Sequence, residues 1–501
     1  MEQRSTIAAI ASPPGQGAIA VIRVSGENTF SICEKISLPS KKGLRLSEQP
    51  ANTIHYGKIH ENGTIIDEVI LSLFKAPRSY TGEDVIEISC HGSAYIQQKI
   101  LQLLLNHGAI HAKPGEFTKR AFLNGKMDLS QAEAVADLIA SESAAFHRVA
   151  VQQMRGGISS ELKSLRTKLL NFISLIELEL DFSEEDVEFA NRSDLKALLS
   201  AISVMLESLT GSFAFGNALK NGIPVVIAGK PNVGKSTLLN NLLMEDKALV
   251  SEIPGTTRDS IEDVIHLDGI SFRFIDTAGL RETTDTIEVM GIRRTMEKIK
   301  MADVILLVAE ATDKPSHINH LVEGLRMRPE FKEKRIILLL NKSDLVDEKG
   351  SSITDGNNGD PASGIMNGSD NPGSPGGPYL GDKDTCDKSL FPSLGGGDSV
   401  LTISAKTGRG LNELRELLVS VVQQEKPGEN DVVVTSLRHY EALKHALDAA
   451  RRASTGLDNN LPGDLLSMDI REVLHHLGEI TGEITTDEIL GNIFKNFCIG
   501  K

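Results

Sequence analysis

The sequence contains no tryptophan, and aromatic residues make up only 4% of its 501 positions. Cysteine is also scarce: the four are Cys33, Cys90, Cys386 and Cys498, and none of them forms a C-x-x-C pair. This spacing indicates neither a disulfide framework nor a cysteine-ligated zinc site. We expect ordinary buried or surface thiols, and Cys498 has no histidine or carboxylate beside it in sequence that would activate it.

Long apolar runs are missing as well. No stretch approaches 18 consecutive apolar residues, and the Met-Glu-Gln-Arg start lacks the apolar core of a signal peptide. The sequence therefore predicts a cytoplasmic protein that does not span a membrane. A chain of this length, with 40% hydrophobic and 24% charged residues, is expected to fold into more than one soluble domain.

The chain also lacks an excess of basic residues. Its 53 Lys and Arg against 68 Asp and Glu give a net charge of −15, opposite to the charge of a strong phosphate-backbone binder. Part of this acidity is local, because residues 350–400 contain seven Asp and two Lys, but the remainder is still acidic. Contact with a nucleic acid is therefore expected to be weak, limited to a patch, or left mainly to a partner.

A phosphate-binding loop is the first chemical motif. Gly229–Ser236 fits G-x-x-x-x-G-K-[ST] and directly follows the apolar run Ile223–Ala228, which predicts a buried parallel strand. The glycines let successive backbone N–H groups face phosphate oxygens, while Lys235 reaches the outer phosphates and the Ser236 hydroxyl is suited to Mg²⁺. A helix that begins near Lys235 would add its positive end.

Three further loops follow predicted strands. Phe272–Ile275 leads to Asp276-Thr277-Ala278-Gly279, where a carboxylate can hold Mg²⁺ through water and a glycine N–H can sense the γ-phosphate. Arg335–Leu340 leads to Asn341-Lys342-Ser343-Asp344, and Val400–Ile403 leads to Ser404-Ala405-Lys406. Each loop alone could be a strand-end turn, but their order is that of a guanine-nucleotide switch.

Asp344 gives this switch its base specificity. Its carboxylate can accept hydrogen bonds from both N1–H and the 2-amino group of guanine, whereas adenine offers no such pair of donors. Because a buried carboxylate without donors is costly, the site is expected to reject ATP. The backbone of Ser404–Lys406 can meet the guanine O6.

Two positions depart from the commonest switch pattern. Leu280 follows the DTAG loop where many such proteins place a glutamine that orients the attacking water, and an aliphatic side chain cannot do this. Asn232, inside the phosphate loop, offers an amide oxygen that could coordinate a monovalent cation beside the phosphates. The alternative for Asn232 is a residue that only stabilises a turn.

Several segments carry a family resemblance. Gly255-Thr256-Thr257-Arg258-Asp259 resembles the switch I signature of the TrmE-Era-EngA-like GTPase group, which includes Era, Der and MnmE. Nearly the whole chain resembles the MnmE (TrmE) family of tRNA modification GTPases, most clearly in segments 11–26, 80–87, 114–118, 120–129 and 497–501.

The resemblance implies an α/β and α+β multidomain fold. An α+β folate-binding and dimerisation domain would occupy residues 1–118, and a Ras-like P-loop GTPase domain, 217–426, would be inserted into a helical domain formed by 119–216 and 427–501. The residue pattern agrees, because strand-like runs such as Ala18–Val24 precede a helical stretch from Leu129 to about Leu180. Helical patterns return at 436–453 and 469–480.

Two local features add detail to this domain organisation. Ser130 and Glu133 look like a capping box at the start of the long helical stretch. Residues 350–400 hold twelve glycines, and we expect the whole segment to be a disordered surface insertion, because its composition buries too little apolar surface to offset the ordering entropy.

The resemblance also assigns site residues. Mg²⁺ would be held by Ser236 and Thr257, and K⁺ by Asn232, Ser251, Ile253 and Thr256; Glu288 would orient the attacking water in place of the missing glutamine. The GTP-binding set is Asn232, Val233, Gly234, Lys235, Ser236, Thr237, Ser251, Glu252, Ile253, Pro254, Gly255, Thr256, Thr257, Asp276, Thr277, Ala278, Gly279, Asn341, Lys342, Asp344, Ser404, Ala405 and Lys406. Without the resemblance, Glu288 would be a solvated helix-surface residue.

A second site would bind a folate, either 5-formyl- or methylene-tetrahydrofolate, through Arg23, Glu87, Lys126 and Lys501. The implied function is GTP hydrolysis that drives addition of a carboxymethylaminomethyl or aminomethyl group to C5 of the wobble uridine of certain tRNAs. The implied partners are a second copy of the chain, a flavin-containing MnmG-type protein and tRNA. The alternative is a regulatory switch of the Era or Der type that acts in ribosome assembly without modification chemistry.

Overall fold

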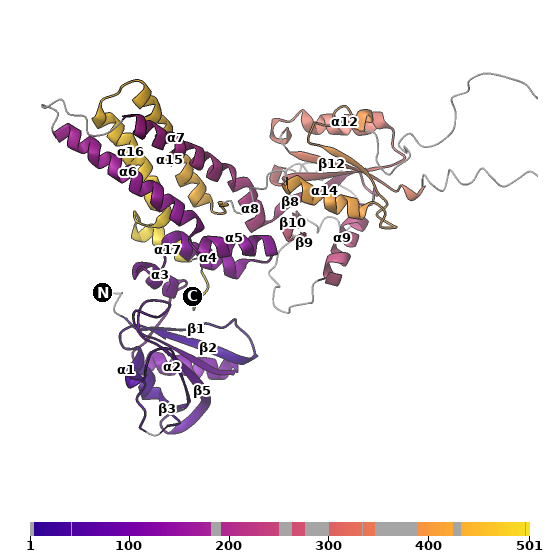
Figure 1. The fold of residues 1–501 in the computed structure, drawn as a ribbon. Coiled ribbons are helices and arrows are strands. Elements are labelled where there is room, and N and C mark those ends of the chain that lie inside the picture. The colour runs from indigo at the N-terminus through magenta and orange to yellow at the C-terminus, as the bar shows by residue number, and fades with distance from the viewer. Residues whose placement is uncertain are drawn as a thin grey trace, which may run out of the picture. The chain divides into compact units, whose positions relative to one another are not determined.

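The computed structural model describes residues 5–41, 43–181, 192–249, 263–275, 300–332, 334–345, 388–423, 432–495 and 497–500. The chain forms two compact units and passes from the first into the second and back (Figure 1). Unit 1 comprises residues 1–141, 147–213 and 430–501, and unit 2 comprises 142–146 and 214–429. This interruption agrees with the predicted insertion of one domain into another, while the four individual boundaries stay a prediction.

The first part of unit 1 is a seven-stranded sheet in the order β3-β4-β5-β6-β2-β1-β7. The strands are β1 (Ile7–Ile10), β2 (Gly17–Ser25), β3 (Ser37–Pro39), β4 (Thr53–Glu61), β5 (Thr64–Phe74), β6 (Val85–Gly92) and β7 (Ile110–His111). Side chains alternate between the two faces, as a period of two requires. One face, with Ile22 and Ile88, packs against α1 (Thr29–Ile36) and α2 (Ala94–Asn106), so the predicted α+β fold is confirmed.

The rest of unit 1 is helical. It contains α3 (Glu116–Leu123), α4 (Leu129–Ala140), α5 (Ala144–Met154), α6 (Gly157–Asp181), α7 (Arg192–Gly211), α15 (Leu437–Asp458), α16 (Gly463–Thr481) and α17 (Asp487–Lys495). In Figure 1 the late helices α15 and α16 lie beside the early helices α6 and α7. One apolar core joins the four, and Ala446, Ala450 and Ala453 on α15 are completely buried in it at helical spacing. The helical domain is therefore built from two distant parts of the sequence.

One helical stretch in the described residues is long and apolar enough to cross a membrane. It runs from Arg192 to Asn221, through α7 and α8 (Phe213–Asn221). Leu195, Leu199 and Ile202 on α7 are completely buried in the core shared with α15. A helix that packs in a bundle core passes the same length and composition test.

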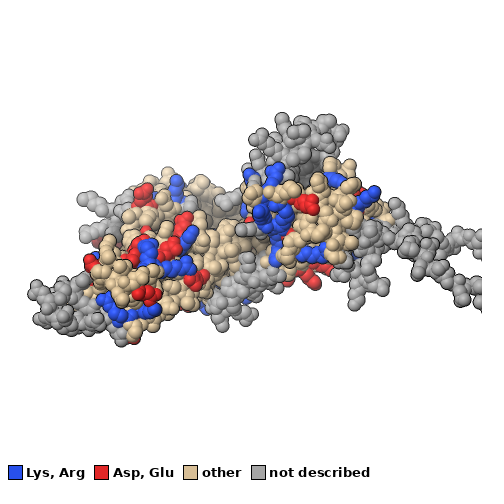
Figure 2. All heavy atoms as spheres, turned by 90° about the horizontal axis from the view of Figure 1, so that it is seen from above, with Lys and Arg blue, Asp and Glu red and all other residues tan. Residues whose placement is uncertain are grey.

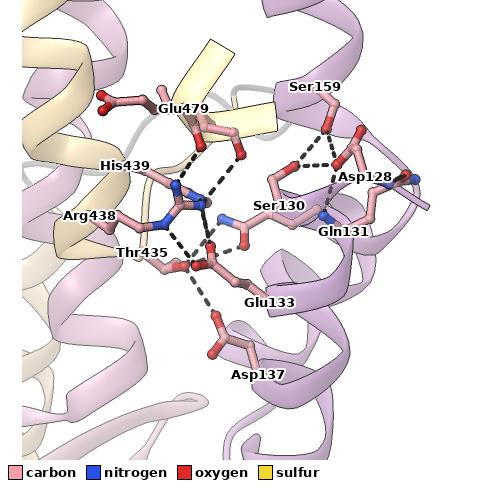
Figure 3. Close-up of polar contacts among 12 residues, drawn as sticks. Asp128, Ser130, Gln131, Glu133, Asp137, Ser159, Thr435, Arg438, His439 and Glu479 are labelled. Atoms are coloured by element: carbon pink, nitrogen blue, oxygen red, sulfur yellow. Dashed lines mark hydrogen bonds and ion pairs between the residues drawn. The ribbon is translucent and has the colours of Figure 1, made fainter. Parts of the chain in front are cut away.

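The start of α4 corrects the predicted capping box. The N-cap is Asp128, whose side chain accepts a hydrogen bond from the Gln131 backbone N–H, while the Gln131 side chain accepts one from the Asp128 N–H (Figure 3). Ser130 and Glu133 do not form the box, because the extended residue before the helix is Asp128 and both of them lie inside α4. Ser130 instead bonds Ser159 and Asp128, which leaves Glu133 for contacts with α15.

Unit 2 is an α/β fold around a six-stranded sheet in the order β13-β12-β11-β8-β10-β9. Its elements are β8 (Ile223–Gly229), α9 (Lys235–Leu249), β9 (Asp263–Leu267), β10 (Ile270–Phe274), β11 (Val304–Glu310), α12 (Pro315–Arg326), β12 (Arg335–Asn341), β13 (Ser399–Thr402) and α14 (Leu411–Gln423). All neighbouring strands are parallel except β9 and β10. The near-continuous apolar strands β11 and β12 are buried as expected for a parallel sheet, and all four strands predicted to precede the motif loops are confirmed.

The predicted disorder of residues 350–400 is wrong for their last thirteen residues. Phe391 is 1% exposed and Leu394 is 8% exposed, and both pack in the core between β12 and α12. Asp398 is also buried, accepts two hydrogen bonds from Arg326 at 2.6 and 2.5 Å, and caps the N–H of Ile336 at 2.9 Å. An averaged composition does not reveal these three side chains among so many glycines. The rest of the predicted segment, residues 350–387, lies outside the described residues.

This packing makes Phe391 a stabilising residue of unit 2. Phe391→Ala is expected to lower the free energy of unfolding of that unit by about 3–5 kcal/mol, because it removes a buried ring and leaves a cavity. Met327→Ala is the matched control, since Met327 is 80% exposed and its loss is expected to cost less than about 0.5 kcal/mol. Calorimetric melting of the two variants checks this, and equal melting temperatures would place Phe391 outside the core.

Candidate guanine-nucleotide site

The predicted nucleotide-binding loops meet at one edge of the unit 2 sheet. Strands β8, β12 and β13 run parallel, so their carboxyl ends, which carry the Gly229, Asn341 and Ser404 loops, lie on the same side. After β8 the chain forms β9 and β10 on one side of that strand, and it then forms β11 on the other side. The order of the strands therefore changes direction at β8. Ligands of open α/β sheets bind at such a switch point.

The phosphate loop has the backbone that its glycines were expected to supply. Gly229 has a φ of 153° and Gly234 a φ of 97°, and Asn232 between them has a left-handed φ of 62°. A Cβ added to Gly229 would lie 2.3 Å from the Val308 carbonyl oxygen, and one added to Gly234 would lie 2.3 Å from Asn341 Nδ2. Both positions therefore require glycine, whereas asparagine tolerates the left-handed conformation better than most residues.

Lys235 stands at the start of α9 and curls over this loop. Its Nζ donates hydrogen bonds to the carbonyl oxygens of Gly229, at 2.9 Å, and Lys230, at 2.6 Å. Burial lowers the pKa of the Lys235 ammonium group. The lysine is thus held over the loop whose N–H groups and helix start attract phosphate.

Asn341 joins the phosphate loop to the loop after β13. Its Nδ2 donates to the Val233 carbonyl at 2.7 Å, and its Oδ1 accepts a hydrogen bond from the Ala405 N–H at 2.8 Å. The side chain is 2% exposed, so both ends of the amide are satisfied within the protein. Its contribution to the site is to hold two loops in register.

Asp344 lies in the same cluster. Its Oδ1 accepts a hydrogen bond from the Ser404 hydroxyl at 2.8 Å, and the Ser343 N–H bonds the Ile403 carbonyl at 3.2 Å. These contacts orient the carboxylate beside the Ser404–Lys406 loop. The two loops that were predicted to recognise guanine are therefore bonded directly to each other.

About half of the predicted GTP set lies in the described residues. The structure brings together the members from the phosphate loop, the Asn341 loop and the Ser404 loop. The following predicted residues lie outside the described residues: Ser251, Glu252, Ile253, Pro254, Gly255, Thr256, Thr257, Asp276, Thr277, Ala278, Gly279 and Glu288.

Comparison with known proteins identifies the family. The model of the MnmE helical domain matches residues 129–498, and the model of the TrmE N-terminus, described as that of a GTP-binding protein, matches residues 6–126. The tRNA modification GTPase MnmE of Bacteroides thetaiotaomicron is 51% identical over 99% of this chain and 100% of its own length. The chain belongs to the MnmE family of tRNA modification GTPases.

Two further relatives are similar along their whole length. The MnmE proteins of Christiangramia forsetii and Flavobacterium psychrophilum are 49% and 48% identical, each over 100% of both chains. The solved G domain of the T. maritima FeoB iron transporter is 24% identical over 40% of this chain and 99% of its own, with a TM-score of 0.22. That score is too low to support any further argument.

Two contacts within the candidate nucleotide site were not predicted from the sequence. The Asn241 side chain on α9 donates to the Ala405 carbonyl, and Glu310 at the end of β11 forms an ion pair with Lys342. Glu310 could have been found, because it is the polar residue at the carboxyl end of a buried parallel strand. Asn241 gives no such signal, since a polar residue on a helix is usually solvated.

The folate residues predicted from the family lie in unit 1. Arg23 on β2 and Glu87 on β6 are direct cross-strand neighbours, with Nε to Oε1 2.9 Å and Nη2 to Oε1 2.8 Å. The Arg23 guanidinium lies 5.3 Å from the Tyr80 ring centre and 5.6 Å from that of Phe117. These rings, which were not predicted, hold the guanidinium by cation–π contact.

Residues close to the C-terminus lie beside the Arg23–Glu87 pair. Arg23 Nη1 donates to the Gly500 carbonyl at 3.2 Å, and the Gly115 N–H donates to the Cys498 carbonyl at 3.3 Å. Lys126 is bonded to the Pro77 carbonyl at 2.9 Å, on the loop that leads to Tyr80. Lys501 lies outside the described residues. The structure therefore brings Gly500 to the Arg23–Glu87 pair and anchors Lys126 to the loop that carries Tyr80.

Both kinds of charge lie on the surface of the described residues. On the face drawn in Figure 2, the described Lys and Arg side chains are interspersed with Asp and Glu. Such mixing differs from the gathered basic residues that are typical of phosphate-backbone binders.

The guanine-recognition geometry can be tested at Asp344. Asp344→Asn is expected to raise the Kd for GTP at least about tenfold, because a hydrogen bond to a charged group contributes about 1.5–3 kcal/mol. The same variant should gain affinity for xanthosine triphosphate, whose C2 carbonyl can accept from the asparagine amide. Met327→Ala, an exposed change away from these loops, serves as the control that should keep the affinity for GTP; binding titrations in which Asp344→Asn still prefers GTP would contradict this role.

Proposed function

We propose that this chain hydrolyses GTP to drive the addition of a carboxymethylaminomethyl or aminomethyl group to C5 of the wobble uridine of certain tRNAs. It would do so in the cytoplasm with a flavin-containing protein of the MnmG type and a folate one-carbon unit. The observation that carries the proposal is the joining of the phosphate loop to the guanine loops through Asn341, in a chain of the MnmE family. The folate and flavin parts rest on the family resemblance.

The metal assignments fit the chemistry of the side chains. Ser236 lies at the start of α9, next to Lys235, and Mg²⁺ and K⁺ both favour oxygen ligands of the kind that Ser, Thr and backbone carbonyls supply. Ser236 and Thr257 would hold Mg²⁺, which neutralises charge developing on the phosphate oxygens. Asn232, Ser251, Ile253 and Thr256 would hold K⁺, and the left-handed backbone of Asn232 places a short amide within the loop itself.

The folate assignment fits the Arg23–Glu87 pair. The guanidinium and the carboxylate are only partly buried, with side-chain exposures of 14% and 28%, so both can be reached from solvent. An anionic glutamate tail would bind Arg23, Lys126 and Lys501, and the donor nitrogens of a pterin would bind Glu87. The folate would supply the one-carbon unit.

The outer face of the N-terminal sheet supports a homodimer. Ile54, Tyr56 and Ile70 are 71%, 51% and 45% exposed, and Tyr56 pairs directly with Ile70 across β4 and β5. Ser72 lies on the same face, because it pairs with Ile54 on β4 and with Glu87 on β6. The face therefore extends from the three apolar side chains to the Arg23–Glu87 pair. Contiguous exposed apolar side chains indicate an interface, and a second copy would cover the face and border the folate site.

The family matches support the alternative of a ribosome-assembly switch less well than they support the proposal. Era-type and Der-type proteins carry a KH-type module or a second GTPase domain. The matches to the MnmE helical domain and the TrmE N-terminus instead occupy both sides of the nucleotide-binding part.

Nucleoside analysis of tRNA tests the proposal as a whole. A strain that lacks this chain should lose the modified wobble uridine, and the intact gene should restore it. Lys235→Ala should fail to restore it, since the lysine that reaches the outer phosphates is gone. Unchanged tRNA nucleosides in the deletion strain would favour the ribosome-assembly alternative, and full rescue by Lys235→Ala would separate modification from GTP.

Potassium dependence tests the assignment of Asn232. Replacing Na⁺ by K⁺ should accelerate GTP hydrolysis at least about tenfold, because a preorganised positive group at the transition state is commonly worth about 10²–10³ in rate. Asn232→Gly should abolish the difference while keeping the left-handed backbone. Equal rates in the two salts for the unaltered protein would leave Asn232 as a turn residue.

Glu288 is proposed to orient the attacking water. Glu288→Ala should bind GTP with unchanged affinity but hydrolyse it about 10²-fold or more slowly, in the range typical of general-base and positioning groups. Single-turnover hydrolysis measures this, and a rate equal to that of the unaltered protein would return Glu288 to the helix surface.

A further inference from the structure

Lys and Arg residues gather at one edge of the unit 2 sheet, in contrast to the mixing of charges over the surface as a whole. Strands β8, β10, β11 and β12 run parallel, so their amino ends lie on the edge opposite the Gly229, Asn341 and Ser404 loops. The described residues of this basic edge are Arg273, Lys300, Arg328, Lys332, Lys334 and Arg335.

Hydrogen bonds join the two segments that carry most of these residues. Lys334 Nζ donates to the Lys300 carbonyl at 2.7 Å. The Arg335 N–H donates to the Asp303 carbonyl at 3.3 Å. The segment that leads into β12 is therefore bonded to the segment that leads into β11, and their basic residues share one edge.

Asp303 is the acidic residue that lies among these cations. Its N–H donates to the Pro224 carbonyl at 2.8 Å, and Pro224 is the cross-strand neighbour of Arg273 on β10. Burial raises the pKa of the Asp303 carboxyl group, while Lys334 and Arg273 act to lower it. Two cations thus lie near this one carboxylate, and the balance of charge at the edge stays positive.

The segment between α12 and β12 is held in a defined conformation. Arg326 Nη1 donates to the Phe331 carbonyl at 2.9 Å and to the Lys332 carbonyl at 2.7 Å. Arg326 Nη2 donates to Asp398, so the charge of this arginine is matched by a buried carboxylate. Arg328 and Lys332 are exposed on the backbone that Arg326 holds. Cations on a fixed backbone lose less conformational entropy when they bind a ligand.

The dimensions and charge of the edge suit a phosphate backbone. Residues 326–335 contain five Lys and Arg against two Glu, within a chain of net charge −15. Arg273 on β10 and Arg335 on β12 are three strand spacings apart, which is roughly 14 Å. A nucleic acid helix presents several phosphates over such a length.

We propose that this basic edge of unit 2 binds the phosphate backbone of tRNA. A local concentration of cations allows a chain that is acidic as a whole to hold a polyanion. The proposal rests on the proposed function in tRNA modification, and it deepens that function by naming the surface that contacts the RNA. Because such contacts release counterions, the binding should weaken steeply as salt is added.

Titration of the full chain with tRNA over a range of salt concentrations tests the basic edge. The double variant Arg328→Gln with Lys332→Gln removes two of its exposed cations. Each lost phosphate contact reduces the slope of log Kd against log salt concentration by about 0.7–0.9, so the double variant should lose about 1.4–1.8. Its Kd for tRNA at low salt should rise at least about fivefold.

A matched control removes two exposed lysines of unit 1, Lys168 and Lys444, by the same change to glutamine. It has the same net charge as the test variant, and it should keep the salt slope and a Kd for tRNA within about twofold of the unaltered chain. Both variants should bind GDP with unchanged affinity, because the basic edge is opposite the nucleotide loops. Cooperative melting establishes that each variant is folded.

The outcomes separate the basic edge from the proposed function. An unchanged salt slope for Arg328→Gln with Lys332→Gln would overturn the tRNA surface and point to an acidic protein as the occupant. An equal loss of affinity in the control would overturn it as well. Absence of tRNA binding by the unaltered, GDP-binding chain would also overturn it and assign the RNA contact to the partner protein. Unchanged wobble uridine in the deletion strain would contradict the proposed function itself, whatever the salt slope.

Discussion

The proposed nucleotide site depends on one buried amide. Asn341 donates to the phosphate loop and accepts from the loop after β13, so movement of either loop alone would break one of these two bonds. Gly234 is glycine because its Cβ position is occupied by this side chain. Asp344, three residues later, is then placed by Ser404 on the loop that Asn341 already holds. The loops proposed to bind phosphate and to recognise guanine thus form a single hydrogen-bonded unit.

The helical domain must likewise join distant parts of the chain, because the residues of unit 2 separate its two halves in the sequence. Apolar packing of α7 and α15 supplies most of the cohesion, but such packing is tolerant of small shifts. The ion pairs of Glu133 with Arg438 and His439 and the Gln153 contact with Val433 add directional bonds at the point where the chain returns. An unpaired Glu133 would be expensive in this largely buried position, so its ion pairs favour one arrangement of α4 against α15.

Much of this could be predicted from the sequence, and the failures have physical reasons. Strands β8, β10, β12 and β13 were predictable because each is an apolar run followed by a loop of known chemistry. The order of residues 388–400 was not, since three buried side chains, Phe391, Leu394 and Asp398, decide it against a glycine-rich average. The capping box was displaced to Asp128 because helix starts depend on backbone geometry that a spacing pattern does not resolve. The Glu133–Arg438 pair joins residues separated by 305 positions, and no local pattern announces such a contact.

The most direct test of the account is the nucleotide affinity of Asn341→Ala. Loss of the amide leaves the Val233 carbonyl and the Ala405 N–H without their partner, which costs about 1–3 kcal/mol for each buried group. The Kd for GDP should therefore rise about 100-fold, and the preference for GDP over ADP should fall in the same titrations. A folded Asn341→Ala protein that binds GDP within about threefold of the unaltered chain, with its guanine preference intact, would contradict the claim that this amide holds the site together.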